Sequence, residues 1–233
     1  MKDSKTDNLQ ARRPLKVRDA GFARGFAAWL SGKMITPNQI SVTSVAFAAM
    51  SALCFLSIPA LGNGAEYGLP SFSPNIALIL LPLLAALFIQ LRLLCNLFDG
   101  MVAVEGGKRT ASGELFNDIP DRIADPLILV SAGYAMSSLN GFEALGWCAG
   151  VLSVMTAYVR TLAASIGAPV NFQGPMAKQH RMALMTAAAV VAAVEWLLWP
   201  PGYAFAVALA IVCVGSVLTV VRRTLSAYRY LEG

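Results

Sequence analysis

Residues 96–121 read NLFDGMVAVEGGKRTASGELFNDIPD, and this stretch decides how the rest of the chain is interpreted. It joins two long apolar runs, at 75–104 and 113–137, and it places acids and amides inside both of them. The connecting segment, 105–112, is short and contains two adjacent glycines, as expected of a loop that reverses the chain. We therefore expect two antiparallel helices whose polar side chains meet at one end.

The whole chain is too apolar for a soluble globular protein. Of its 233 residues, 57% are hydrophobic and 13% are charged, whereas soluble domains have about 45–50% and about 25%. Its four cysteines are scattered without a CxxC pair, so their spacing supports neither a disulfide framework nor a zinc site. The net charge of +5 comes from residues that flank apolar stretches. That arrangement favours an anionic membrane surface as partner and argues against nucleic acid.

Six apolar runs are each long enough, or nearly long enough, to cross a bilayer as a helix. Because the runs are continuous and do not alternate, they favour helices over a transmembrane barrel. We expect an all-α, polytopic membrane protein with six transmembrane helices and no internal repeat. The runs lie at 39–60, 75–104, 113–137, 142–168, 181–198 and 203–221.

An amphipathic helix is expected ahead of the first span. Over residues 17–31, Phe22, Phe26, Trp29 and Leu30 recur at helical spacing beside charged residues. This pattern favours a helix that lies in the membrane interface, and an ordinary packing helix is the alternative. The predicted organisation is a cytoplasmic amino-terminal segment with the interfacial helix at 1–38, a transmembrane domain at 39–221 and a basic tail at 222–233.

Basic residues predict the orientation in the membrane. Lysine and arginine occur in the amino-terminal segment, in the tail and in the loops at 105–112 and 169–181. The loops at 61–74, 138–141 and 199–202 have none. With six spans, all the basic segments fall on one side, which the positive-inside rule assigns to the cytoplasm. We expect an integral protein of the plasma (inner) membrane with both termini cytoplasmic.

Several ionisable residues lie within the runs, where each costs at least about 2.5–3.5 kcal/mol on insertion scales. Asp118 and Arg122 are one helical turn apart and can pair for purely structural reasons. Arg92 and Asp125 both lie roughly 18 Å from the loop, counted along their helices, so we expect them to pair as well. A functional role is the default for the others. The complete set is Arg92, Asp99, Asp118, Asp121, Arg122, Asp125 and Arg160.

Two helical faces concentrate oxygen ligands. Asn96 and Asp99 share a face of the second span, and a stripe spaced by four residues follows the third span. The stripe consists of Gly113, Asn117, Asp121 and Asp125. Acids and amides without histidine or thiolate select a hard cation such as Mg²⁺, Mn²⁺ or Ca²⁺.

Cations on the same side as these acids indicate a phosphate or diphosphate substrate. For Lys108 and Arg109, a role in setting membrane topology is the more economical explanation. The one histidine, His180, lies in a basic loop, where a solvated or phosphate-adjacent group is favoured over a general base. The candidate phosphate-binding residues are Lys108, Arg109, Arg160, Lys178 and Arg181.

Residues 96–121 resemble the signature of the CDP-alcohol phosphotransferase (CDP-alcohol phosphatidyltransferase) family, D-x2-D-G-x2-A-R-x8-G-x3-D-x3-D. Three positions depart from the signature: Asn96 and Asn117 stand for aspartates, and Val104 stands for the arginine. The matching positions are Asp99, Gly100, Ala103, Gly113 and Asp121.

The resemblance extends over most of the chain. Residues 36–40, TPNQI, are similar to the family's amino-terminal segment, and six spans agree with its membrane domain. Residues 174–181, GPMAKQHR, are similar to a bacterial subgroup that carries the same two asparagines.

The resemblance implies a reaction, in which a substituted phosphate passes from a CDP-linked donor to an alcohol and CMP is released. It implies CDP-diacylglycerol (CDP-DAG) as donor, a role in phospholipid biosynthesis, Mg²⁺ or Mn²⁺ as cofactor and a homodimer. Asp121 would be the catalytic base, with Gly100, Ala103 and Gly113 at the nucleotide and Lys178 and Arg181 on phosphate. Lys108, Arg109 or Arg160 would replace the arginine lost at Val104. The implied metal ligands are Asn96, Asp99, Asn117, Asp121 and Asp125.

Two other functions stay open at this point. The asparagines are also consistent with a catalytically impaired family member that has a structural or regulatory role. A small-solute transporter is less favoured, because it would have a site near the membrane midplane and often inverted repeats, which the sequence lacks.

Overall fold

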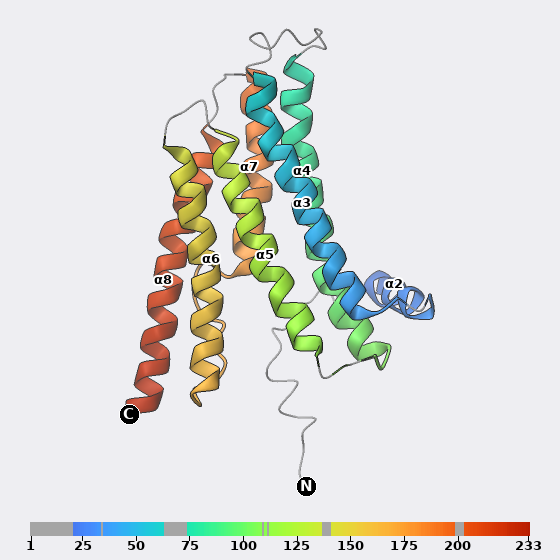
Figure 1. Cartoon of the computed structure of the whole chain (residues 1–233), viewed down its shortest axis with the longest axis vertical. Coiled ribbons are helices and arrows are strands. Elements are labelled where there is room, and N and C mark those ends of the chain that lie inside the picture. Colours follow the sequence, from blue (N-terminus) through green and yellow to red (C-terminus); the bar gives the residue numbers. More distant parts are fainter. Residues whose placement is uncertain are drawn as a thin grey trace.

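The computed structural model describes residues 21–33, 35–62, 74–108, 110, 112–136, 141–198 and 203–233. Within these ranges all regular structure is helical, and six long helices form an antiparallel bundle with one short helix beside it (Figure 1). The helices are α2 (Gly21–Gly32), α3 (Pro37–Gly62), α4 (Pro74–Glu105), α5 (Gly113–Tyr134), α6 (Phe142–Ser165), α7 (Lys178–Leu198) and α8 (Ala204–Glu232).

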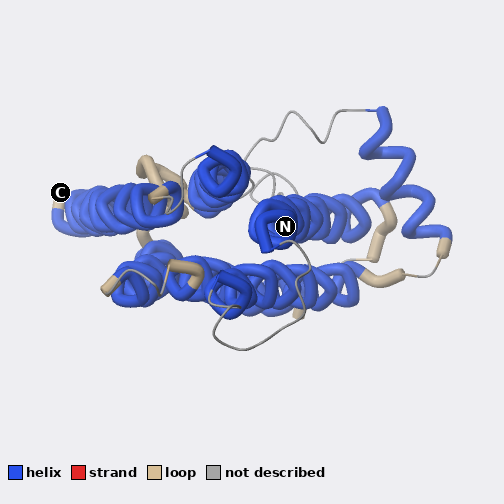
Figure 2. Tube along the Cα trace, turned by 90° about the horizontal axis from the view of Figure 1, so that it is seen from above, coloured by secondary structure: helices blue, strands red, loops and turns tan. Residues whose placement is uncertain are grey.

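The long helices form a closed ring of neighbours. Helix α3 packs on α4 and α5, α6 lies between α5 and α8, and α7 lies between α4 and α8. Seen from above, they stand in two rows (Figure 2). Because successive helices alternate in direction, the end of α4, the start of α5, the end of α6 and the start of α7 lie at the same end of the bundle. This end holds most of the charged residues of the spans, and it is called the polar end below.

Five of the long helices, α3, α4, α6, α7 and α8, are long and apolar enough to cross a membrane. Helix α5 has 22 residues but is not among them. The expectation of six spans is therefore met for five helices and stays a prediction for α5. The physical reason is that Asp118, Asp121, Arg122 and Asp125 lower the mean hydropathy of α5 although it lies within the ring.

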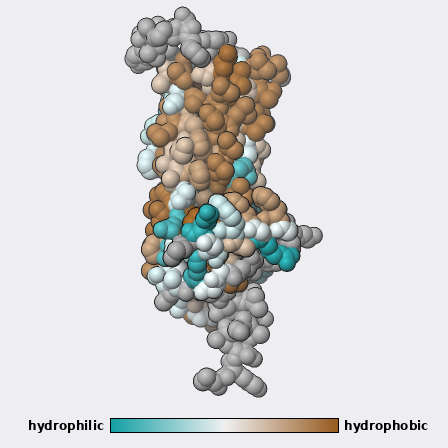
Figure 3. All heavy atoms as spheres, turned by 90° about the vertical axis from the view of Figure 1, so that its right-hand side faces the viewer, coloured by the Kyte–Doolittle hydropathy of each residue, from teal (hydrophilic) through white to brown (hydrophobic). Residues whose placement is uncertain are grey.

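The outer surface also has the character of a membrane protein. Figure 3 shows hydrophobic side chains over the upper part of one face and hydrophilic ones gathered below them. Large apolar side chains such as Val151 and Val214 are exposed, at 60% and 62%. Helix α4, with 32 residues, is about 48 Å long, whereas the hydrocarbon core of a bilayer is about 30 Å thick. These features indicate an integral membrane protein whose longest helix extends beyond the hydrocarbon.

Close packing of small residues joins α5 to α6 away from the polar end. A Cβ on Gly146 would lie 2.9 Å from the carbonyl oxygen of Val130 and 3.0 Å from the Cα of Gly133. Such contacts let backbones approach where lipid gives no hydrophobic driving force. Ile128 and Leu129 are fully buried beside them. This contact fixes how α5 enters the ring.

Helix α2 covers the outside of α4 at the polar end. Ala23, Ala27 and Leu30 are buried on one face, whereas Phe22 and Trp29 are exposed at 82% and 55%. A helix is therefore present over the described part of the predicted range 17–31, of which residues 17–20 lie outside the described residues, but Leu30 packs against protein and does not share the exposed aromatic face. Its interfacial location stays a prediction.

The start of α3 and the end of α8 each follow from the local sequence. At the start of α3, the Gln39 N–H donates to the Thr36 hydroxyl and the Thr36 N–H donates to the Gln39 side chain, which is a capping box with Pro37 in the first turn. At the other end of the chain, α8 runs without a break to Glu232. The predicted tail at 222–233 thus continues the last helix, and its cytoplasmic location stays a prediction.

Candidate functional site

A cavity of about 770 Å³ lies between the helices at the polar end. Each predicted site residue within the described ranges lies on its wall, whereas Arg109 lies outside them. The stripe on α5 and the Asn96–Asp99 face of α4 therefore point into one space, and the roles of these residues stay predictions. The predicted residues on the wall are Asn96, Asp99, Gly100, Ala103, Lys108, Gly113, Asn117, Asp121, Asp125, Arg160, Lys178 and Arg181.

Both carboxylate oxygens of Asp121 accept hydrogen bonds. Oδ1 accepts from Arg92 Nη2 at 3.0 Å and from Asn96 Nδ2 at 3.1 Å, and Oδ2 accepts from the Lys178 ammonium. The Asp121 side chain is 13% exposed, and that of Lys178 is 27% exposed. Three helices thus converge on the residue predicted to be the catalytic base.

Asp125 binds two arginines in the interior. Its Oδ1 lies 2.5 Å from Arg92 Nη2, which confirms the predicted pair, and its Oδ2 accepts from Arg181 Nη2 at 2.7 Å. All three residues are at most 4% exposed. Among the described residues, Nε and Nη1 of Arg92 have no hydrogen-bond partner. Buried ions are tolerated where opposite charges lie this close, so Arg92 depends on Asp121 and Asp125.

Asp99 is held by a residue that the sequence did not single out. The Ser41 hydroxyl on α3 donates to Asp99 Oδ2 at 2.6 Å, and both residues are buried. Ser41 directly follows the TPNQI segment at 36–40, and that resemblance was the available signal. The contact ties the start of α3 to the motif on α4.

Asp118, Arg122 and Arg160 form a charge cluster nearer the surface, called the outer charge cluster. Arg122 Nη2 lies 2.8 Å from Asp118 Oδ2, which confirms the predicted i, i+4 pair, and Arg160 Nη2 on α6 lies 3.3 Å from Asp118 Oδ1. The Arg160 guanidinium also lies 5.5 Å from the ring centre of Phe172. These side chains are 25–35% exposed, so water weakens the pairing.

The loop before α7 is tied to α8. Gly174 has φ +123°, and a Cβ there would lie 2.5 Å from Thr219 Cγ2, so only glycine fits without strain. The Met176 N–H donates to Thr219 Oγ1 at 3.0 Å, and Arg181 Nη1 donates to the Met176 carbonyl at 2.9 Å. These contacts place Lys178 at the first residue of α7, facing the cavity.

Arg223 is a second residue that sequence reasoning missed, because its position in the basic tail suggested only a topological role. It is buried, its Nη1 donates to the Thr156 carbonyl at 2.6 Å and its Nε donates to the Gln173 carbonyl at 2.9 Å. No local signal distinguished it from Arg222, which is exposed.

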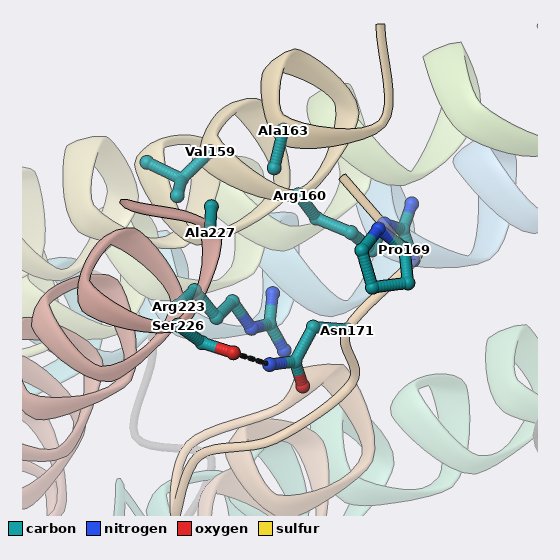
Figure 4. Close-up of a pocket in the computed structure, with 8 residues that line it drawn as sticks. All are labelled: Val159, Arg160, Ala163, Pro169, Asn171, Arg223, Ser226 and Ala227. Carbon is teal, nitrogen blue, oxygen red and sulfur yellow. Dashed lines mark hydrogen bonds between the residues drawn. The ribbon is translucent and has the colours of Figure 1, made fainter. Parts of the chain in front are cut away.

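Figure 4 shows a small side cavity where α6, α8 and the loop before α7 meet. Arg160 and Arg223 line both this cavity and the large one. The Asn171 amide donates to the Ser226 hydroxyl at 2.9 Å across its floor. The two arginines therefore mark where the cavities adjoin.

Lys108 and His180 both contact backbone carbonyls. The Lys108 ammonium donates to the carbonyls of Ser31 and Ile35, at 2.8 and 3.3 Å, and so joins the end of α2 to the wall of the cavity. His180 is exposed, its Nδ1 lies 2.7 Å from the Pro175 carbonyl, and it does not line the cavity. Its use as a general base gains no support.

A divalent cation fits the residues around Asp121 poorly. Within the described ranges, no cluster of three or more acid, histidine or cysteine side chains could hold a metal ion. An ion at Asp121 would have to displace Lys178 and lie beside Arg92, and like charges at such distances repel strongly where water is scarce. Asp99 and the amide oxygens of Asn96 and Asn117 would remain as ligands, which is little charge for Mg²⁺ or Mn²⁺.

Comparison with known proteins identifies the fold. By sequence, no protein-family profile and no curated protein matches the chain. By structure, the chain is similar to phosphatidylinositol phosphate synthase of Mycobacterium tuberculosis with CDP-DAG bound, at a TM-score of 0.72 and 19% identity, covering 90% of this chain and 94% of that one. For the same synthase with manganese and citrate, the TM-score is 0.68 and the sequence identity is 18%, covering 88% of each chain. For its apo form, the TM-score is 0.67 and the sequence identity is 19%, covering 88% of this chain and 95% of that one. At this identity the likeness establishes a shared fold.

Proposed function

We propose that this protein is a CDP-alcohol phosphotransferase that transfers a phosphatidyl group from CDP-DAG to an alcohol, releasing CMP, in phospholipid biosynthesis. The observation that carries the proposal is the convergence of Asp99, Asp121 and Lys178 on one cavity at the polar end of a membrane bundle. The shared fold supports it, because the Mycobacterium synthase was solved with CDP-DAG bound.

The proposed reaction needs one nucleophilic displacement at phosphorus. The acceptor hydroxyl oxygen forms a bond to the phosphorus that carries the lipid, and the bond between that phosphorus and the CMP oxygen breaks. CMP leaves with the bonding electron pair, and the hydroxyl proton passes to the Asp121 carboxylate. The protein contributes mainly position and charge.

Residues around Asp121 have distinct parts in this proposal. Lys178 and Arg181, from the start of α7, bind the diphosphate. Gly100, Ala103 and Gly113 leave room on the wall for the nucleotide, because none carries a side chain larger than methyl. Arg160 and Lys108, at the rim, replace the arginine that the signature has at Val104.

The membrane arrangement is part of the proposal. Helix α5 would cross the membrane as well and so complete the six spans, with its charges covered by α4, α6 and α7. Both termini would be cytoplasmic in the plasma membrane. Helix α2 would lie in the interface with Phe22 and Trp29 toward lipid, which their exposure supports. As the resemblance implies, the protein would act as a homodimer.

The cofactor is the point on which the observations diverge. The Mycobacterium synthase solved with manganese supports Mg²⁺ or Mn²⁺, whereas Lys178 and Arg92 already offset the charge of Asp121 in this chain. If an ion binds, the residues left to hold it are Asp99, Asn96 and Asn117, where it would neutralise the diphosphate.

The experiment is CMP release from CDP-DAG by purified protein, screened over alcohol acceptors with and without metal. Asp121→Asn should lower the rate by about 10²–10⁴-fold, because it removes the proton acceptor and keeps the shape. Glu143→Gln is the matched control, since Glu143 lies in the first turn of α6, at the end of the bundle away from the cavity. Unchanged CMP release by Asp121→Asn would refute the base assignment.

The same screen tests the alternative that the protein is catalytically impaired. Two observations favour this alternative. Asparagine stands at 96 and 117, where the signature has aspartate, and Asp121 is paired with Lys178. If protein that still binds nucleotide releases no CMP with any acceptor, with or without metal, the transferase proposal is rejected in favour of a structural or regulatory role.

A further inference from the structure

At Asp121 and Asp125, which lie with Asp99 among the buried or nearly buried acids of the cavity wall, the contacting cations outnumber the carboxylates. Arg92, Lys178 and Arg181 all contact Asp121 or Asp125, so three cations meet two carboxylates. A site that holds a divalent cation is normally built with the opposite balance. Two of these cations, Lys178 and Arg181, lie on the cavity wall, where a phosphate ligand can contact them.

The sequence changes and this geometry point the same way. The neutral Asn96 and Asn117 stand where the signature has aspartates, and the signature acid that remains on α5, Asp121, is bound by an ammonium group. Asn96 turns its amide nitrogen toward Asp121 and acts as a donor. Each difference weakens attraction for a metal ion and strengthens attraction for phosphate.

Lys178 occupies an oxygen of Asp121 that a metal ion would need free. Its ammonium lies on Asp121 Oδ2 and its side chain is part of the cavity wall. The anchored loop at Gly174 and Met176 fixes the start of α7 and therefore the base of this side chain. Arg92, with 0% exposure, lies behind the carboxylates and does not line the cavity.

We propose that the Lys178 ammonium takes the place of a divalent cation at Asp121 and binds the diphosphate of the donor, so that nucleotide binding and transfer in this chain do not require metal. Lys178 supplies positive charge to the departing CMP. Arg92 is a positioning residue that holds Asp121 and Asp125. This inference rests on the proposed function for its substrate.

Direct binding of CDP tests the proposal without relying on turnover. Isothermal titration of CDP into the purified full chain should give the same Kd, within about twofold, in EDTA and in Mn²⁺. Lys178→Met should weaken binding by at least about tenfold in both conditions, whereas Lys178→Arg should stay within about threefold of the parent because it keeps the charge. Arg222→Met removes an exposed cation on α8 and serves as the matched control.

A converse variant checks the reason for the effect. Asn96→Asp, Asn117→Asp and Lys178→Met together restore the signature's acids and remove the ammonium. This triple variant should bind Mn²⁺, measured as loss of the free-ion signal in electron paramagnetic resonance, and should bind CDP only with metal. The parent chain should leave the Mn²⁺ signal unchanged. Single-peak elution and an unchanged unfolding midpoint identify variants that fold.

The outcomes separate this inference from the proposed function. CDP binding by the parent that is lost in EDTA and restored by Mn²⁺ overturns the inference and leaves the transferase proposal standing. Equal CDP affinity of Lys178→Met and the parent also overturns it. Metal-independent CDP binding without CMP release supports the inference on Lys178 and rejects the transferase proposal. Absence of CDP binding under every condition overturns both.

Discussion

The two halves of α5 solve the same packing problem in opposite ways. In the half nearer the polar end, Asp118, Asp121 and Asp125 each contact a cation from another helix. In the other half, Gly133 meets Gly146 of α6 at backbone distance. The two halves of one helix therefore differ in what holds them: contacts between small residues hold the half away from the polar end, and charge pairs shape the cavity in the other half.

The strongest way to break the polar half is to remove its buried carboxylate. Asp125→Asn leaves Arg92 and Arg181 buried without their main counter-charge and should cost about 3–5 kcal/mol of unfolding free energy. Denaturant titration in detergent, followed by circular dichroism, measures it. Asp118→Asn on the same helix should cost no more than about 1 kcal/mol, because its side chain is 35% exposed. Equal losses in the two variants would contradict the distinction between buried and outer pairs.

A larger side chain at the contact between α5 and α6 should lower the stability of the protein. Gly146→Val forces side-chain atoms against the α5 backbone and should cost about 1–3 kcal/mol by overpacking. The same titration measures the loss, and CDP affinity should change less than stability because the contact lies away from the cavity. Gly25→Ala is the control, since nothing lies within 4 Å of a Cβ there. A neutral Gly146→Val would mean that the two helices are not held at backbone distance.

The smallest effect is expected in the outer charge cluster. Arg122→Ala removes an i, i+4 pair with Asp118, and such pairs contribute about 0.3–0.5 kcal/mol. Arg160 still contacts Asp118 in that variant. A double-mutant cycle with Asp118→Asn measures the coupling, which should fall as salt is added. Coupling above about 2 kcal/mol would show that this cluster behaves like the buried one.

Much of the fold was predictable, because a long apolar run in the sequence predicts a membrane helix. The runs at 39–60, 75–104 and 142–168 lie within a few residues of α3, α4 and α6. The third run, 113–137, was the exception, because the charged residues of α5 keep it out of the set of helices apolar enough to cross a membrane. The run predicted to end at 221 continues as one helix to 232, because no helix-breaking residue intervenes.

The candidate site was predictable in part. Depth counted from one loop paired Arg92 with Asp125, and one-turn spacing paired Asp118 with Arg122. Ser41 on Asp99 and Lys178 on Asp121 were not foreseen. Both involve helices whose relative rotation no local pattern reports.

The sequence by itself therefore determined the helices, the face of each that carries acids, and the end of the bundle where these faces meet, because helical period and apolar length are local properties. Only the tertiary structure decided which cations of α6 and α7 reach these acids. Helix α7 lies beside α4 although α5 and α6 come between them in the chain, and that long-range closure brings Lys178 to Asp121 and buries Arg181 on Asp125. Side chains brought together by ring closure leave no periodic trace in the sequence, because their spacing depends on loops and packing and not on the helical repeat.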